Sequence, residues 1–326
     1  MVDDDRRRIN ASGQGAVGAA QRQGARNPVG PRLSDRLWRA TQTAMYDGFG
    51  AGVSSYSHTY AIDRRFAKLR DTPGDDRARE VNAATARRHL PGLYERWCAV
   101  TPGAVTRDKA WWADHLEDRT TQRGNGSALH YTIHPDGFLT YRVVGSRQHA
   151  FRPPLGTVVV EDFCPITDEA HTELLQTLLV LEMFYRVEID VPPDDPLPLK
   201  LVDQRAAETK GISDFLWVRI NDVPEVLGAR GYAADTDIVL DVTDPLGLAG
   251  GRFQLQTRDG AGKCTPHDGP ADLEIGLADL ATVYMGAHRG AQLARAKRIT
   301  ELRQGALGRL DAAFGAERAP FCGTVL

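Results

Sequence analysis

The sequence has little of several features that would assign it to a special class of protein. Its cysteines are far apart and form neither a CxxC pair nor a Cys/His cluster with zinc-ligand spacing: Cys98, Cys164, Cys264 and Cys322. No apolar run reaches the roughly 20 residues needed to cross a bilayer, and no signal-peptide apolar region follows the N-terminus. We therefore expect buried, inert thiols, no metal site, no membrane span and a cytoplasmic location.

An excess of charge of either sign is also missing. Forty Lys and Arg residues stand against 43 Asp and Glu, which gives a net charge of −3 at pH 7. A nucleic-acid partner would need a broad basic face, so we expect none. The content of 42% hydrophobic and 25% charged residues is typical of a globular protein, and 326 residues suffice for two or three domains.

Short catalytic motifs are scarce. Gly13, Gly15 and Gly18 spell GxGxxG, but a charged stretch and no strand precedes them, which argues against a dinucleotide site. No GxSxG or HExxH sequence occurs. His267 and His288 are either two separate structural histidines or a pair that meets in space.

Three regions follow a polar N-terminal tail. The first 40 residues hold eight arginines and four aspartates with few apolar residues, and resemble a tail. Alternation from Val53 to Ile62 then predicts a strand with one covered face. Residues 71–80 form a polar linker to the second region.

The second region begins near Val81. Leu90, Tyr94 and Trp97 lie at helical spacing, with Pro91 near the start of that helix. Two alternating runs around Pro135-Asp136-Gly137 predict a hairpin over residues 128–144. A strand, a helix and a strand over residues 156–191 predict a βαβ crossover.

The third region begins near Ser213. Strands are expected over 214–220, 237–243, 251–257 and 272–277. Asp222, with Glu225 three residues on, predicts the start of a short helix that Gly231 ends. An apolar stripe from Leu277 to Met285 predicts an amphipathic helix, and more helix is expected up to Phe314.

One stretch resembles a known family. "AMYDGFGAG", Ala44 to Gly52, running into "SSYSHTYAIDRRFAKLR", is similar to the end of the acetyltransferase domain in the Eis (enhanced intracellular survival) proteins of the GNAT superfamily. The resemblance continues, in the family's order, to the end of the chain through "YERW", "HPDGFLTYRV", "DPLPLKLVD", "LWVRINDVPEVLGARGYA", "KCTPHDGPADLEIGLADLATVYMGAHR" and "RLDAAF".

The resemblance implies a mixed α/β and α+β architecture. GNAT-like mixed sheets precede a sterol-carrier-protein-like α+β domain. The expected divisions are a remnant tail over 1–35, the end of a first GNAT domain over 36–75, a second GNAT-like domain over 80–212, and the sterol-carrier-like domain over 213–326.

The resemblance also implies a reaction. In the family, acetyl-CoA gives its acetyl group to an amine, with aminoglycosides and lysine side chains among the acceptors, and the assembly is a hexamer. Tyr46 matches the family's tyrosine, which acts as general acid toward the departing thiolate. The terminal carboxylate of Leu326 would act as general base. Gly48, Gly50 and Gly52 would let the backbone and a bulky cofactor pass close to the phenol.

The sequence departs from the family at the acetyl-CoA phosphates. The family's pattern Q/R-x-x-G-x-G/A is reduced to Arg6-Arg7-Arg8, with Ile9 where the glycine should stand. We therefore expect truncation or a frame shift upstream of Ser34, a homo-oligomer only if the first domain is completed, and loss of activity if acetyl-CoA cannot bind.

Two further expectations concern the rest of the chain. The second GNAT-like domain should have no CoA site, because Pro165, Asp168 and Glu169 stand where phosphates would dock and no glycine does. The alternative to an N-acetyltransferase is a non-enzymatic scaffold, formed by the second and third domains, that binds a lipid or a partner protein.

Overall fold

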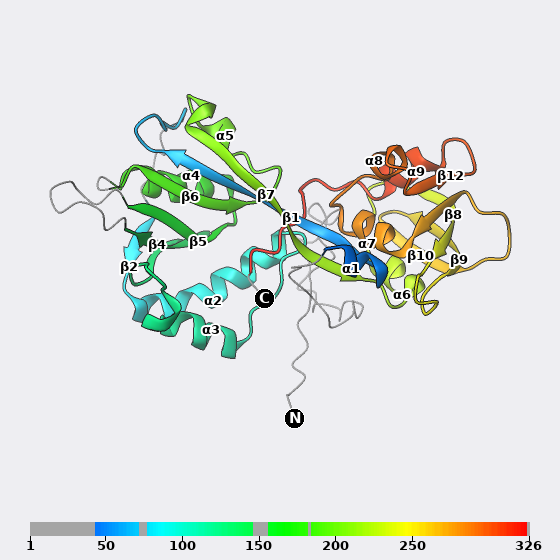
Figure 1. The fold of residues 1–326 in the computed structure, drawn as a ribbon, viewed down its shortest axis with the longest axis horizontal. Helices are drawn as coiled ribbons and strands as arrows, with labels where there is room; N and C mark the ends of the chain where they lie inside the picture. Colours follow the sequence, from blue (N-terminus) through cyan, green and yellow to red (C-terminus); the bar gives the residue numbers. More distant parts are fainter. Residues whose placement is uncertain (1–42, 72–76, 146–155, 182–183, 325–326) are drawn as a thin grey trace. The chain divides into compact units, whose positions relative to one another are not determined.

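The computed structural model describes residues 43–71, 77–145, 156–181 and 184–324. The chain forms two compact units, coloured along the sequence in Figure 1. Unit 1 comprises Met1–Tyr56, Thr101–Val105 and Asp214–Leu326, and unit 2 comprises Ser57–Val100 and Thr106–Ser213. Each unit has its own sheet and its own hydrophobic core.

A seven-stranded sheet with the order β2-β3-β4-β5-β6-β1-β7 forms the frame of unit 2. Its strands are β1 (Ala51–Asp63), β2 (Arg79–Val81), β3 (His130–His134), β4 (Gly137–Val144), β5 (Thr157–Pro165), β6 (Arg186–Val191) and β7 (Ala207–Arg219). β1 and β7 lie next to each other and are long enough for their outer ends to belong to unit 1. β3 and β4 pair antiparallel, which confirms the predicted hairpin.

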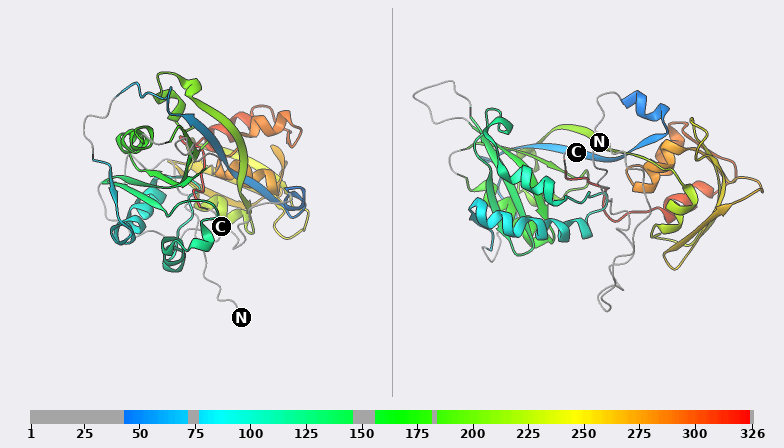
Figure 2. Two further views of the ribbon diagram at one scale, coloured as in Figure 1. Left: turned by 60° about the vertical axis from the view of Figure 1, so that its left-hand side comes forward. Right: turned by 90° about the horizontal axis from the view of Figure 1, so that it is seen from below.

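Helices cover both faces of this sheet. The helical segments of unit 2 are α2 (Ala83–Val100), α3 (Lys109–Glu117), η2 (Thr120–Gln122), α4 (Asp168–Leu179), α5 (Leu197–Lys200) and η3 (Gln204–Ala206). Leu139 and Tyr141 of β4 share a core with the leucines of α4, whereas Phe138 meets the ring of Trp112 on α3. Since successive residues of a strand point to opposite faces, α4 lies on one face and α2 with α3 on the other (Figure 2).

The strand–helix–strand prediction over 156–191 is confirmed. β5 leads through α4 to β6, and the two strands pair in parallel. Their pairing covers only Thr157–Val159 of β5. Further along, the register between β4 and β5 shifts at Glu161, which is a β-bulge. A bulge re-aims the following side chains, and here it precedes the buried Asp162.

The prediction for Pro91 was wrong. The helix begins at Ala83, so Pro91 lies in its interior and not near its start. Asn82 starts the helix, because its side chain accepts a hydrogen bond of 2.9 Å from the backbone N–H of Thr85. The buried residues Ala86, Leu90 and Tyr94 then hold both sides of the proline against the sheet, which offsets the lost backbone hydrogen bond.

A five-stranded sheet with the order β10-β9-β8-β11-β12 forms the core of unit 1. Its strands are β8 (Thr236–Thr243), β9 (Gly251–Arg258), β10 (Ala261–Pro266), β11 (Leu273–Gly276) and β12 (Ile299–Glu301). The helices are α1 (Thr43–Gly48), α6 (Val223–Ala229), α7 (Leu277–Met285), α8 (Gly290–Arg295) and α9 (Ala306–Ala313). One hydrophobic core joins this sheet to α6, α7 and α9.

The sequence predicted most of these elements. Asp222 caps α6 through a 2.8 Å hydrogen bond from the backbone N–H of Glu225, although α6 ends before Gly231. α7 has the predicted bounds and ends at Gly286, whose φ of 88° is left-handed. The helix expected up to Phe314 is in fact two helices with β12 between them. β10 was not predicted, because most of its residues are exposed and show no alternation.

Candidate active site

Tyr46 lies in the last turn of α1, immediately before β1. Its half-buried ring packs against that of Trp217 on β7, with 5.5 Å between ring centroids. The Trp217 indole N–H donates a hydrogen bond of 2.7 Å to the Asp214 carboxylate, which fixes the indole. The backbone N–H of Phe49 bonds the carbonyl of Tyr46 at 3.0 Å and closes the helix end. The phenol is therefore held from its ring and from its own backbone.

Two of the three glycines after Tyr46 are required by packing within the protein. Gly50 has a φ of 69°, and a Cβ there would overlap the guanidinium of Arg219. A Cβ at Gly52 would overlap the carbonyl oxygen of Ala278 on α7. A Cβ at Gly48 would meet nothing within 4 Å. Gly50 and Gly52 thus bring the turn against β7 and α7, whereas the close passage of a cofactor stays a prediction.

We expect Gly52→Ala to destabilise the protein by about 1–3 kcal/mol, because β1 must move away from α7 to admit one methyl group. Urea denaturation followed by circular dichroism measures the loss. Gly48→Ala is the matched control and should change the free energy of unfolding by less than about 0.5 kcal/mol. Equal effects of the two substitutions would contradict the close approach of β1 to α7.

Carboxylates surround the Tyr46 turn, and most are paired. Arg298 bridges Asp47 and Asp279, with N–O distances of 2.8 and 2.7 Å. Burial raises the pKa of Asp279, although the neighbouring Arg298 opposes that shift. Asp214 makes no ion pair with any described residue. Asp214 thus contacts the Tyr46–Trp217 pair through the indole N–H.

His267 and His288 do not bind one another. The Nε2 atom of His288 lies 2.9 Å from the Tyr56 hydroxyl, and its Nδ1 lies 3.1 Å from the Gln292 side chain. Burial, followed by the charge of Asp214, raises the pKa of Tyr56. Within the described ranges, no group of three or more His, Cys, Asp or Glu side chains is arranged to hold a metal ion.

The segment before the C-terminus is held in unit 1 without regular secondary structure. The backbone N–H of Phe321 donates to the carbonyl of Pro102 at 2.8 Å. Gly103, with a φ of 78°, lets Pro320 pack on its Cα, where a Cβ would crowd the proline ring. Thr324 is buried. The described tail up to Thr324 is therefore packed against the body of unit 1.

Four of the predicted site residues lie outside the described residues. These are Arg6, Arg7, Arg8 and Leu326. Tyr46 is the predicted site residue whose surroundings the structure describes. Trp217, which packs on Tyr46, and Asp214, which bonds Trp217, were not among the predicted residues. The sequence feature that could have indicated them is an aspartate and a tryptophan within the same predicted strand, "DFLWVRI".

The N-terminus of α4 is occupied by groups of the protein itself. Thr167 caps it, with its hydroxyl accepting a hydrogen bond of 3.2 Å from the N–H of Ala170. Asp168 and Glu169 lie in the first turn, and Lys200 donates to the Asp168 carbonyl at 3.0 Å. These carboxylates repel phosphate groups. The absence of a CoA site at this junction stays a prediction.

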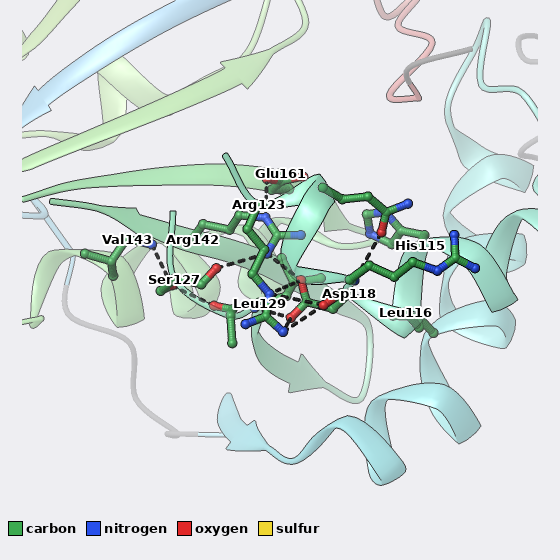
Figure 3. A network of polar contacts seen from close by, with 12 residues as sticks. His115, Leu116, Asp118, Arg123, Ser127, Leu129, Arg142, Val143 and Glu161 are labelled. Carbon is green, nitrogen blue, oxygen red and sulfur yellow. Dashed lines mark hydrogen bonds and ion pairs between the residues drawn. The ribbon is translucent and has the colours of Figure 1, made fainter. Parts of the chain in front are cut away.

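A network of ion pairs centred on Arg142 lies in the domain that contains α4. Figure 3 shows Arg142 of β4 between two carboxylates, with Nη1 donating to Asp118 at 2.6 Å and Nε donating to Glu161 at 2.8 Å. Asp118 also accepts a hydrogen bond of 3.0 Å from the Leu129 N–H. Burial alone would raise the pKa of Asp118, but these hydrogen bonds lower it. The network ties the segment after α3 to the bulge of β5.

The family of this chain follows from its similarity to known proteins. Residues 103–220 match the acetyltransferase (GNAT) domain, and residues 223–323 match the sterol carrier protein domain. The chain is 36% identical over 286 residues to the N-acetyltransferase Eis of Mycobacterium tuberculosis (strain ATCC 25177 / H37Ra), covering 85% of this chain and 68% of that protein. The chain belongs to the Eis family of GNAT N-acetyltransferases.

Further similarities agree with this membership. An uncharacterized N-acetyltransferase of Streptomyces griseus subsp. griseus is 32% identical over 296 residues, which is 87% of this chain and 71% of that one. The crystal structure of Eis1 from Mycobacterium abscessus matches with a TM-score of 0.78 and 32% identity, covering 89% of this chain and 73% of that chain. The predicted family, the mixed fold and the acyltransferase class are confirmed.

The Eis-family chain has no membrane-spanning candidate in its described part. None of the helices there is both long and apolar enough to cross a bilayer. Tyr46 lies outside both matched domain ranges, so the comparison of domains assigns it no role.

Proposed function

We propose that this chain transfers the acetyl group of acetyl-CoA to a primary amine, with Tyr46 as the general acid. The observation that supports this most is the way the phenol is held. Its ring rests on Trp217, and its backbone is fixed at the junction of α1 and β1. A general acid needs such a defined position, because proton transfer works only within hydrogen-bond reach of the leaving atom.

Each proton in the proposed reaction has a named partner. Acetyl-CoA supplies an acetyl thioester when it is bound. Tyr46 gives its phenolic proton to the thiolate sulfur as the amine nitrogen bonds to the acyl carbon and the C–S bond breaks. The Leu326 carboxylate accepts the proton that the amine loses. The buried segment that ends at Thr324 supports this role, since a frayed terminus could not hold a carboxylate in place.

The charge beside Tyr46 supports a cationic acceptor. Asp214 touches the Trp217 indole and has no cation paired with it among the described side chains. A protonated amine would be attracted to this carboxylate, and its hydrocarbon or sugar body could lie on the indole face. We therefore propose aminoglycosides or lysine-type amines as acceptors.

We propose that the phosphates of CoA bind elsewhere than at the N-terminus of α4. The N-terminus of α4 does not suit a pyrophosphate, because it is capped by Thr167 and carries two carboxylates. Arg6, Arg7 and Arg8, which lie outside the described residues, stay the proposed phosphate contacts. A guanidinium suits phosphate through paired N–H donors.

Calorimetric titration of the 326-residue chain with acetyl-CoA tests the proposed function. We expect saturable one-to-one binding, followed by release of CoA thiol when an aminoglycoside or a lysine-containing peptide is added. Tyr46→Phe should bind acetyl-CoA as the natural chain does, because the phenol acts only on the leaving group. A folded sample that gives neither heat nor thiol would overturn the proposal and favour a binding scaffold.

A further inference from the structure

Arg219 is the buried link between the Tyr46 turn and the sterol-carrier-like domain. It stands at the end of β7 and forms a two-pronged ion pair with Asp244, with Nη1–Oδ1 and Nη2–Oδ2 distances of 2.9 and 2.7 Å. The same Nη1 atom donates a hydrogen bond of 2.5 Å to the carbonyl oxygen of Phe49. One guanidinium therefore joins three segments that are far apart in the sequence.

Asp244 gives this link a rigid base. Its side chain is fully buried, and its carboxylate accepts hydrogen bonds of 2.9–3.1 Å from the backbone N–H groups of Leu246, Leu248 and Ala249. The hydrogen bonds from Arg219 and from this loop hold the pKa of Asp244 well below its usual range. The carboxylate is therefore ionised at neutral pH, and the loop between β8 and β9 is folded around it.

The turn is shaped to receive the guanidinium. The Phe49 carbonyl lies three residues after Tyr46, and the Phe49 N–H bonds the Tyr46 carbonyl. Gly50 follows with a φ of 69°, and a side chain there would overlap Arg219. The contact of Arg219 with the Phe49 carbonyl therefore depends on Gly50, because only a residue without Cβ leaves room there for the guanidinium.

A second side-chain contact of this turn is weaker. Arg298 holds Asp47, but the two side chains are 46% and 57% exposed. Exposed ion pairs contribute about 0–1 kcal/mol. The Arg219 side chain is only 13% exposed, and its bidentate geometry fixes direction as well as distance. Arg219 is thus the stronger restraint on the turn.

We propose that Arg219 is a positioning residue for Tyr46, and that the sterol-carrier-like domain, through Asp244, is the base on which the catalytic turn is set. The proposal rests on the proposed function of Tyr46 as general acid. Arg219 itself touches no reacting atom. It acts by fixing the backbone that carries the phenol, so that the hydroxyl meets the leaving sulfur.

Steady-state kinetics of acetyl transfer tests the proposal. Arg219→Gln should lower kcat by about 10- to 100-fold, because a small misplacement of a proton donor has an effect of that order. KM for acetyl-CoA should stay within about twofold, since the link makes no contact proposed for the cofactor. Arg219→Lys should recover part of kcat, since an ammonium can reach the Phe49 carbonyl but cannot form both bonds to Asp244.

A second variant and a matched control separate positioning from general loss of structure. Gly50→Ala should reproduce the kcat loss, because its methyl group displaces the same guanidinium. Arg252→Gln removes another Arg–Asp pair of the same domain, that with Asp241, and should leave kcat unchanged. An unchanged kcat in Arg219→Gln, or an equal loss in Arg252→Gln, would overturn the proposal.

A measurement without turnover distinguishes this proposal from the proposed function. In proton NMR of the natural chain, the Tyr46 ring should show cross-relaxation with the Trp217 indole. Arg219→Gln should lose that signal while the methyl signals of the core around Leu240 and Leu280 keep their shifts. If no amine is acetylated, loss of the signal would still support positioning by Arg219. A retained Tyr46–Trp217 signal in the variant would overturn it.

Discussion

Tyr46→Phe is expected to lower the rate of acetyl transfer by about 10²- to 10⁴-fold, the usual effect of a general acid. The substitution removes one hydroxyl and keeps the ring, so the contact with Trp217 at 5.5 Å between centroids should persist. Only the proton for the departing thiolate is lost. The thiolate must then leave without one, which raises the barrier of the step that breaks the C–S bond.

Continuous detection of the released CoA thiol measures this effect at saturating acetyl-CoA. Tyr185→Phe is the control, since it makes the same chemical change at a phenol that is 42% exposed in unit 2. It should retain the full rate. If Tyr46→Phe transfers acetyl groups within about twofold of the natural chain, Tyr46 has no part in the chemistry.

Elements with one clear period could be predicted from the sequence. The hairpin predicted over residues 128–144 has apolar residues at every second position, and α7 has them once per helical turn. Their burial therefore follows from spacing alone. Pro91 was misplaced because a local rule about proline was overridden by packing of the helix on the sheet. β10 gave no signal, since its exposed residues pair through backbone atoms, which every sequence has.

The site divides in the same way. Tyr46 could be singled out as a candidate because the glycine-rich turn around it is a local sequence feature that resembles the family's turn. The structural role of Gly50 and Gly52 could not be predicted from the sequence. The atoms that they approach belong to Arg219 and Ala278, which are more than 160 residues away along the chain. A glycine in a sequence indicates a close approach, but it does not say to what. Trp217 was not linked to Tyr46 because their contact joins residues that are distant in the sequence.

A second large effect is expected in unit 2, where Asp162 and Arg107 form a buried ion pair with an N–O distance of 2.6 Å. Asp162 also accepts a hydrogen bond of 3.0 Å from Thr140. The guanidinium lies 4.0 Å from the ring centroids of Tyr94 and Trp111. Asp162→Asn should destabilise the protein by about 3–5 kcal/mol, because it leaves a buried guanidinium without its counter-charge.

Urea denaturation measures the loss, and Asp241→Asn is the control. Asp241 pairs with Arg252 at 2.6 Å, but both side chains are about a third exposed, so about 0–1 kcal/mol is expected. Adding Arg107→Met to Asp162→Asn should recover part of the stability, because the unpaired charge then disappears. Equal effects of the two Asp→Asn changes would contradict a buried pair.

The pH dependence of the same measurement separates charge from packing. Burial alone would raise the pKa of Asp162, but the charge of Arg107 and its hydrogen bond to the carboxylate lower it well below the usual range. The folded state therefore binds the proton less tightly than the unfolded chain does. The pair's stabilisation is complete above pH of about 4, where an unfolded aspartate is ionised, and decreases as the pH falls. Asp162→Asn should lose that part of the acid-dependent slope, whereas a variant that disturbed only packing would keep it.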